Sequence, residues 1–320
     1  MKKLTLLFSF VLIWGAPQFV WACDACGLFS GVTPMDLKSQ AGLYFRYRTF
    51  HGLNTNYYSG PGNGSNKTLH APSEHPGPKP DGYSPDIRES YYRVAANLRW
   101  FLKDRWNLQA SLPVTSNFEQ YGASRKSGKG YGDISTMLNY GLLIGENDQQ
   151  AWRVFVGAGL KLPSGWRFRR QKDRENFTDI QGGTGSLDFL LQVQGSWRIG
   201  NNGLTANVMT RINTRNSEQV RYGNFHNVNL NIFHQFDLLA LNSRLLVYTG
   251  GYLEHFSGRF DQGERQTNTG GTTLFSNIGL NWFVDRYSFR PQVQLPVLQK
   301  LNGVQLLNQP IVSFEASIAF

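Results

Sequence analysis

From Gln40 onward the chain alternates between apolar and polar residues with a period of two, the pattern of a β-strand that has two unlike faces. The stretch 224–238 shows this most clearly, because apolar residues and histidines fall on one face and amides on the other. An α-helix would scatter those amides around its whole circumference. The segments 186–199 and 131–144 repeat the alternation. These patterns predict an all-β fold.

The lengths of the connections between strands narrow this fold class further. About twelve alternating segments can be counted, at 40–51, 89–102, 106–115, 131–145, 151–162, 186–199, 203–214, 223–238, 243–257, 271–285, 287–297 and 309–320. Connections after even-numbered segments are short, whereas 52–88, 116–130, 163–185 and 258–270 are longer polar loops after odd-numbered ones. Outer-membrane barrels have an even strand count, tight periplasmic turns and long extracellular loops. We therefore predict a transmembrane antiparallel up-and-down β-barrel over 40–320, of about twelve strands, with both termini periplasmic.

A soluble β-sandwich would also alternate, but it has no reason to sort its loops by length. Large aromatic residues also gather at the short-turn ends of the segments, as an interfacial girdle would: Trp100, Trp106, Trp152, Trp197, Trp282 and Tyr287. The last alternating run ends on Phe320, which resembles the terminal signal read by the barrel assembly machinery. We therefore favour the barrel and expect membrane lipid and that machinery as partners.

Residues 1–22 have the pattern of a secretory signal peptide, with Lys2 and Lys3, an apolar run and a cleavage position after Ala22. A lipoprotein signal is the alternative, in which Cys23 becomes the acylated N-terminus, although Trp21 fits such a site poorly. No later stretch approaches the roughly 18 uninterrupted apolar residues of a membrane helix. We expect export to the outer membrane of a Gram-negative cell, with 23–39 as a periplasmic segment.

The formal net charge is +10, from 32 Lys and Arg against 22 Asp and Glu. Because a charge facing the bilayer centre costs a few kcal/mol, the polar strand faces must line the lumen. The candidate lining residues are Arg46, Arg48, Arg93, Arg99, Asp133, Arg153, Lys161, Asp188, Arg198, Arg211, Asp285, Arg290 and Glu315. A basic lining attracts anions, but most of these residues are expected to pair and brace the barrel. We predict a narrow or gated pathway, and no nucleic-acid partner for an exported chain.

Three glycine-rich stretches resemble a known group of proteins. They are 130–135 (GYGDIS), 157–165 (GAGLKLPSG) and 183–188 (GTGSLD). They are similar to motifs of bacterial outer-membrane barrels described as transporters or as meta-pathway phenol-degradation-like proteins, which are related to long-chain fatty-acid channels. The stretch 22–27 (ACDACG) also resembles a subgroup that opens with an ACDxCGC motif, although Leu28 replaces the third cysteine. The resemblance implies passage of small molecules, hydrophobic ones included.

Cys23 and Cys26 form the one spacing with evident chemical potential. In the oxidising periplasm they could close a small disulfide that acts as a biogenesis checkpoint, contact a metal with outside help, or be lipidated at Cys23. His70, Glu74 and His75 could bind a metal weakly, but we expect a polar extracellular loop there. We therefore predict no cofactor and no metal site within the chain.

The function we predict is a channel for small solutes, hydrophobic or anionic, through a narrow basic-lined lumen, without enzymatic activity. One alternative is a lipid hydrolase, because His255 and Ser257 share a strand face as the His and Ser of outer-membrane phospholipases do. In that case Asn268 or Glu254 would have to orient the histidine. A second alternative is a structural or adhesion barrel that acts through its extracellular loops.

Overall fold

A computed structural model describes residues 37–54, 87–103, 105–167 and 180–320. Most of this chain is β-strand. The strands are β1 (Gln40–Leu53), β2 (Ile87–Lys103), β3 (Trp106–Tyr121), β4 (Ser124–Tyr131), β5 (Ser135–Glu146), β6 (Gln150–Lys161), β7 (Asp188–Ile199), β8 (Asn202–Ile212), β9 (Val220–Arg221), β10 (Phe225–Leu238), β11 (Ser243–Phe256), β12 (Phe260–Asp261), β13 (Glu264–Arg265), β14 (Gly271–Val284), β15 (Tyr287–Leu301), β16 (Leu306–Asn308) and β17 (Ile311–Ala319).

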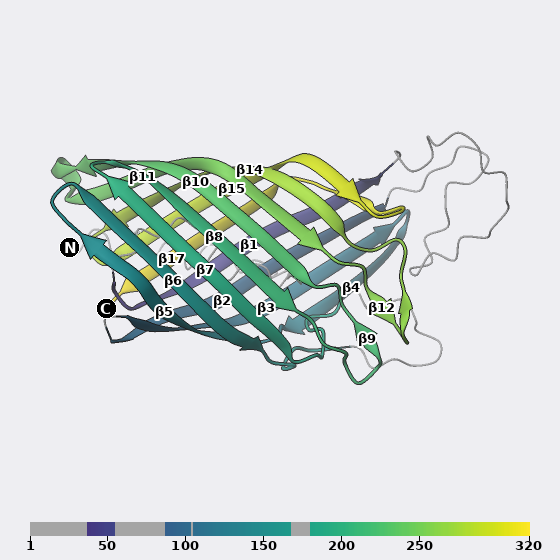
Figure 1. Cartoon of the computed structure of the whole chain (residues 1–320). Coiled ribbons are helices and arrows are strands. Elements are labelled where there is room, and N and C mark those ends of the chain that lie inside the picture. The colour runs from purple at the N-terminus through teal and green to yellow at the C-terminus, as the bar shows by residue number, and fades with distance from the viewer. Residues whose placement is uncertain (1–36, 55–86, 104, 168–179) are drawn as a thin grey trace, which may run out of the picture.

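The long strands form one closed antiparallel barrel (Figure 1). Each pairs with its neighbour in the chain, and β1 closes the ring by pairing with β2 on one side and β17 on the other. β4 and β5 pair with successive parts of β3 and together form a single barrel strand that is interrupted at residues 132–134. The predicted antiparallel barrel is therefore confirmed, with twelve strands around the ring.

The two ends of the barrel differ as the connection lengths predict. At one end lie short connections such as the turn at Asp285, and at the other lie long segments that carry β9, β12, β13 and β16. The prediction of a loop at 116–130 is wrong. β3 continues to Tyr121 and β4 begins at Ser124, so this stretch is a β-hairpin. Gly122 supports its tight turn with a φ of 53°. Gly128 and Gly130 occupy two positions on one face of β4, so this strand shows little alternation in the sequence.

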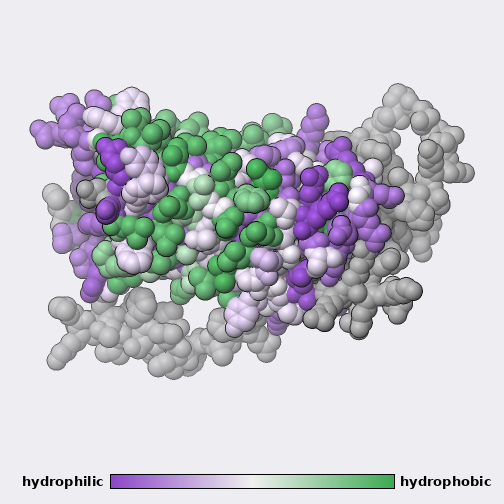
Figure 2. Space-filling view, turned by 60° about the horizontal axis from the view of Figure 1, so that its bottom comes forward, coloured by the Kyte–Doolittle hydropathy of each residue, from purple (hydrophilic) through white to green (hydrophobic). Residues whose placement is uncertain are grey.

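The outer surface carries an apolar belt between two hydrophilic ends (Figure 2). Exposed aliphatic residues form the belt, and the predicted aromatic girdle is exposed beside the short turns: Trp100, Trp106, Trp152, Trp197, Trp282 and Tyr287. No helix in the described part of the chain is long and apolar enough to cross a membrane. A closed barrel leaves no unpaired strand edge, and an apolar belt suits the hydrocarbon of a bilayer. The architecture is that of an outer-membrane barrel, in agreement with the predicted location.

The interior is mainly polar. Amide side chains such as Asn229 and Asn277 bond to one another across strands, with 2.8 Å from Asn277 Nδ2 to Asn229 Oδ1. Three small apolar clusters interrupt this lining in the described part of the chain, and one of them is formed by Met137, Leu190, Met209, Phe225 and Phe256. The interior is thus largely filled by side chains, as a barrel of this size allows.

Candidate functional site

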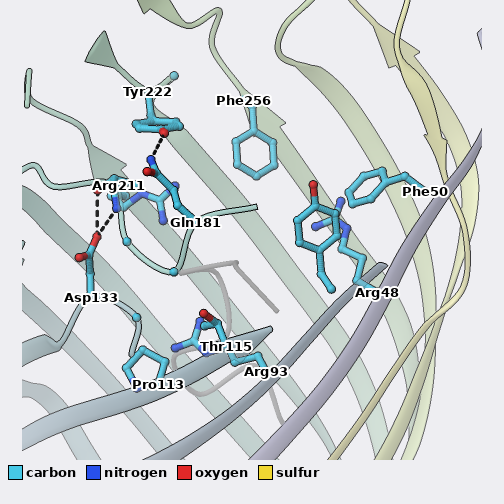
Figure 3. A pocket seen from close by; sticks show the side chains of 16 residues that line it. Arg48, Phe50, Arg93, Pro113, Thr115, Asp133, Gln181, Arg211, Tyr222 and Phe256 are labelled. Atoms are coloured by element: carbon cyan, nitrogen blue, oxygen red, sulfur yellow. Dashed lines mark hydrogen bonds between the residues drawn. The ribbon is translucent and has the colours of Figure 1, made fainter. Parts of the chain in front are cut away.

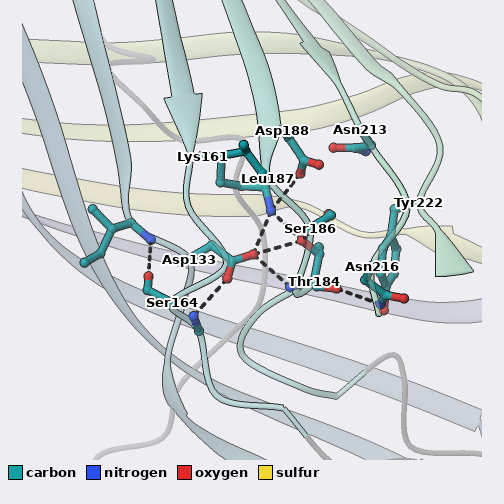
Figure 4. Close-up of polar contacts among 12 residues, drawn as sticks. Asp133, Lys161, Ser164, Thr184, Ser186, Leu187, Asp188, Asn213, Asn216 and Tyr222 are labelled. Carbon is teal, nitrogen blue, oxygen red and sulfur yellow. Dashed lines mark hydrogen bonds and ion pairs between the residues drawn. The ribbon is translucent and has the colours of Figure 1, made fainter. Parts of the chain in front are cut away.

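The three glycine-rich motifs, which are far apart in sequence, meet inside the barrel. Asp133 lies in the break between β4 and β5, Lys161 is the last residue of β6, and Asp188 is the first residue of β7. In the barrel these three positions are neighbours (Figure 4). They sit where the segment between β6 and β7 leaves the wall and folds inward.

Lys161 is fully buried between two carboxylates. Its Nζ lies 2.7 Å from Asp133 Oδ2 and 2.7 Å from Asp188 Oδ2. The same Nζ also donates to the Thr184 hydroxyl. The ammonium group therefore donates hydrogen bonds to Asp133 and Thr184 and forms an ion pair with Asp188. We call Asp133, Lys161, Thr184 and Asp188 the lumen ion cluster.

Backbone and hydroxyl donors complete the lumen ion cluster. The Asp133 carboxylate accepts hydrogen bonds from Gly165 N at 2.9 Å and from Thr184 N at 2.8 Å, and the Thr184 hydroxyl adds a third at 2.9 Å. Asp188 Oδ1 accepts from Thr214 N at 3.0 Å. Buried charges are tolerated when they are paired and hydrogen-bonded in this way. The cluster therefore fixes the ends of β6 and β7 to the break between β4 and β5.

Two glycines of the motifs are required by close approach around Asp133. A Cβ on Gly183 would lie 2.5 Å from Asp133 Oδ1 and 2.7 Å from the Cα of Gly165. Glycines of β4 serve the same purpose, since a Cβ on Gly128 would lie 2.2 Å from the carbonyl oxygen of Ile180, and one on Gly130 would lie 2.7 Å from Trp166. Glycine thus lets the inward backbone lie directly on β4.

Residues 180–186, which we call the inward segment, lie against the inner face of β3 and β4. Asn117 Nδ2 donates to the Gln181 carbonyl at 3.3 Å, and Gln181 Nε2 reaches the Tyr222 hydroxyl at 2.7 Å. Ile180 and Gln181 are both buried. The inward segment therefore occupies part of the lumen toward the long-loop end and connects β3 to the segment before β10.

A cavity of about 260 Å³ lies beside the inward segment (Figure 3). Part of its wall is aromatic or apolar, from Phe50, Tyr91, Pro113, Tyr222 and Phe256. Its polar lining includes Arg48, Arg93, Thr115, Asp133, Thr184 and Arg211. A ring-sized apolar group and a polar or anionic group could therefore be accommodated together.

Arg48 spans the lumen from β1 to β11. Its guanidinium forms a bidentate pair with Glu254, with 3.2 Å from Nη1 to Oε2, and its Nε donates to Asn308 Oδ1 at 3.1 Å. Phe50 and Phe275 flank the guanidinium, with ring centres 4.8 and 5.8 Å away. Glu254 is not among the predicted lining residues. The alternation along β11 that points Leu253 outward nevertheless points Glu254 into the lumen.

The structure buries most of the predicted lining residues on the inner face of the barrel. These are Arg46, Arg48, Arg93, Arg99, Asp133, Lys161, Asp188, Arg211, Arg290 and Glu315. With Glu254 added, the described lumen contains seven buried cations and four buried carboxylates. Arg290 and Glu315 form a further pair, 3.5 Å from Nη1 to Oε2. The interior is therefore braced by ion pairs and has a basic excess among the described residues.

Three predicted positions lie elsewhere. Arg153 and Arg198 are on lumen-facing positions, but at the short-turn mouth, where both pair with the half-exposed Glu146 at 2.9 and 3.6 Å. The prediction that Asp285 lines the lumen is wrong. It lies exposed in the turn between β14 and β15 with a φ of 53°, because the strand ends one residue earlier at Val284.

The residues of the hydrolase alternative do not form a charge-relay arrangement. His255 and Glu254 are consecutive on β11 and point to opposite sides of the barrel wall. His255 Nδ1 shares a hydrogen bond with Thr272 at 2.8 Å, and Asn268 Oδ1 accepts from Val304 N at 3.1 Å. Neither proposed orienting group therefore contacts the histidine.

Several predictions fall outside the described residues. These are the signal peptide, Cys23 and Cys26, and the loop residues His70, Glu74 and His75. Among the residues that are described, no group of three or more His, Cys, Asp or Glu side chains could hold a metal ion.

Comparison with known proteins identifies the fold. No family model matches the chain, and no curated protein matches it. The crystal structure of an outer membrane channel from Pseudomonas putida F1 is similar, with a TM-score of 0.62 at 13% identity, over 91% of this chain and 100% of that one. The β domain of the Bordetella autotransporter BrkA has a TM-score of 0.46 at 11% sequence identity, and the match covers 88% of this chain and 99% of that one. A mutant of the TodX monoaromatic hydrocarbon channel has a TM-score of 0.38 at 11% sequence identity, and the match covers 88% of this chain and 89% of that one. The chain thus has the fold of an outer-membrane β-barrel.

Proposed function

We propose that this protein is an outer-membrane channel for small solutes whose route passes through the cavity beside the inward segment. The observation that carries the proposal is this cavity of mixed character inside a closed barrel. The similar structure from Pseudomonas putida F1 is an outer membrane channel, which supports the same kind of role here. Ligand sites are typically concave and apolar with a few placed polar groups, as this cavity is.

The lining favours solutes that combine an apolar ring with an acidic group. Phe50, Tyr91 and Phe256 offer aromatic surface, while Arg93 and Arg211 place guanidinium groups in the cavity wall. Guanidinium binds carboxylate through paired hydrogen bonds, and a basic lumen raises the local concentration of anions. We therefore propose small aromatic carboxylates as preferred solutes over neutral sugars of similar size.

We also place the short turns at the periplasmic side and the long loops outside. β1 begins and β17 ends at the short-turn end, and bacterial barrels keep their short turns in the periplasm. The ends of the barrel at Gln40 and Phe320 are then periplasmic, where the assembly machinery would meet the terminal residue. An externally applied protease in intact cells should cut at the exposed turn 262–263 between β12 and β13 and spare the turn at 147–149.

Permeability of purified protein in liposomes tests the channel. We expect swelling with benzoate faster than with a neutral sugar of similar mass, and a reversal potential in a salt gradient that indicates anion preference. The Arg93→Gln, Arg211→Gln double variant should reduce that preference several-fold. Arg286→Gln is the matched control, because Arg286 is exposed in a turn beside Tyr287. Impermeability to every solute class would reject the channel.

A further inference from the structure

A row of polar side chains crosses the outside of the barrel at the loop-side border of the apolar belt. In the strand register Thr210 of β8 is opposite His226 of β10, and His226 is opposite His255 of β11. His255 is in turn opposite Thr272 of β14, which is opposite Lys300 of β15. Both histidines and Lys300 are exposed. We call these five residues the outer polar row.

The next residues toward the short-turn end on the same strands are apolar. They form a parallel register row of Val208, Val228, Leu253, Leu274 and Leu298. Four of the five are strongly exposed, from 38% for Leu253 to 65% for Leu298, as residues in contact with acyl chains would be. The outer polar row therefore lies at the height where acyl chains give way to lipid headgroups.

The two histidines are positioned by their neighbours rather than free to rotate. His226 Nδ1 shares a hydrogen bond with the Thr210 hydroxyl at 3.1 Å, and His255 Nδ1 shares one with Thr272 at 2.8 Å. The ring centres are 6.1 Å apart, and the ring planes differ by 29°. With each Nδ1 engaged, Nε2 is the nitrogen that each ring offers to a ligand. Lys300 adds an ammonium group two strands away, ~10 Å at the usual strand spacing.

We propose that the outer polar row binds a phosphate group of lipid A in the outer leaflet. Three nitrogen donors beside an apolar surface match a lipid that has a phosphorylated head and several acyl chains. A phosphate is large and multidentate, so donors several ångströms apart can share it. The proposal rests on the barrel lying in the membrane with its long loops outside, and it is independent of what crosses the lumen.

Native mass spectrometry of the delipidated, folded barrel with added lipid A tests this site. We expect retention of bis-phosphorylated lipid A, and at least tenfold weaker retention of the same lipid after its phosphates are removed. The His226→Gln, His255→Gln double variant should reduce retention of the phosphorylated lipid about tenfold. Lys300→Gln alone should cause a smaller loss. All these positions are exposed, so a heat-modifiable gel shift should show the variants folded.

His234→Gln provides the matched control. His234 is half-buried on the same outer face of β10 and bonds through Nδ1 to Asn202 at 2.8 Å, but it lies toward the short-turn end of the strand. We expect this variant to retain lipid A like the wild type. Equal retention by the double variant and the wild type, or equal binding of phosphorylated and dephosphorylated lipid, would overturn the proposal. So would a Zn²⁺-dependent retention that a chelator abolishes, because the histidines would then act as metal ligands. Solute permeability of the same variants should stay unchanged, which separates this test from that of the channel.

Discussion

Two ion clusters of the same barrel show how depth changes what a charge pair does. The lumen ion cluster holds Lys161 at 0% exposure between two carboxylates, whereas the mouth cluster joins Arg153 and Arg198 to Glu146, which is 56% exposed. Both occupy ends of neighbouring strands. Only the first carries a network of backbone donors, from Gly165, Thr184 and Thr214.

This difference in burial means that the lumen ion cluster contributes to the stability of the fold, whereas the mouth cluster contributes little. Removing one partner of a buried ion pair leaves an uncompensated charge, whereas an exposed pair loses little because water replaces the partner. The lumen ion cluster also ties Asp133 and Thr184, which lie outside the strands, to Lys161 and Asp188, which the ladder of β6 and β7 places opposite each other. We therefore expect it to control both stability and the position of the inward segment.

The largest effect is expected for Lys161→Met. The substitution leaves Asp133 and Asp188 buried without their shared cation, which costs about 3–5 kcal/mol. The free energy of unfolding, followed by gel mobility against urea concentration in lipid vesicles, should fall by that amount. Channel conductance should rise, because the inward segment loses its attachment.

Arg198→Gln is the control for this variant, since it removes one cation from the mouth cluster. Its unfolding midpoint should match the wild type within error. If Lys161→Met and Arg198→Gln shifted the midpoint equally, the distinction between the two clusters would fail.

Glu254→Gln asks whether the bridge across the lumen behaves like the lumen ion cluster. Arg48 would keep its bond to Asn308 and a single amide acceptor in place of a carboxylate. A hydrogen bond to a charged group contributes about 1.5–3 kcal/mol, and we expect a destabilisation in that range. Urea titration measures it, and Glu264→Gln, on the exposed β13, is the control. An unchanged midpoint would show that Arg48 needs no carboxylate.

Gly183→Ala probes the backbone packing around Asp133 rather than its charge. The new methyl would meet Asp133 Oδ1 and the Gly165 backbone at less than contact distance. Overpacking of this kind costs about 1–3 kcal/mol. Gly195→Ala is the control, because the nearest atom to its Cβ is 3.9 Å away. Equal melting temperatures of the two variants would mean that the inward segment shifts freely to accommodate the methyl group.

Much of the fold could be predicted because strand alternation is a local signal. It placed Arg48, Arg93 and Glu315 on the inner face, since side chains on a strand point to alternate sides. The contact of Asp133 and Thr184 with the register pair Lys161 and Asp188 could not be predicted, because it depends on a strand break and an inward turn of the backbone. The alternation of apolar and polar residues indicates neither the strand break nor the inward turn.

The errors have physical causes of the same kind. The prediction that Asp285 points inward extends the alternation past Val284 into a turn, where it no longer applies. Glu254 was considered only as a partner for His255, although adjacent strand residues face opposite ways. Glycine-rich β4 carries little hydropathy contrast, so its strand was predicted as a loop.

The smallest effect is expected for Glu146→Gln in the mouth cluster. Arg153 and Arg198 lose their shared carboxylate, but both lie at the mouth, and Arg198 also bonds the Gly200 carbonyl at 2.9 Å. Exposed pairs contribute about 0–1 kcal/mol, and salt screens them further. The urea midpoint should therefore move by less than that and should become indistinguishable from wild type at 1 M salt. A shift as large as that of Lys161→Met, persisting in salt, would show that the mouth of the barrel is held by charge after all. In that case burial would not be the property that separates the two clusters.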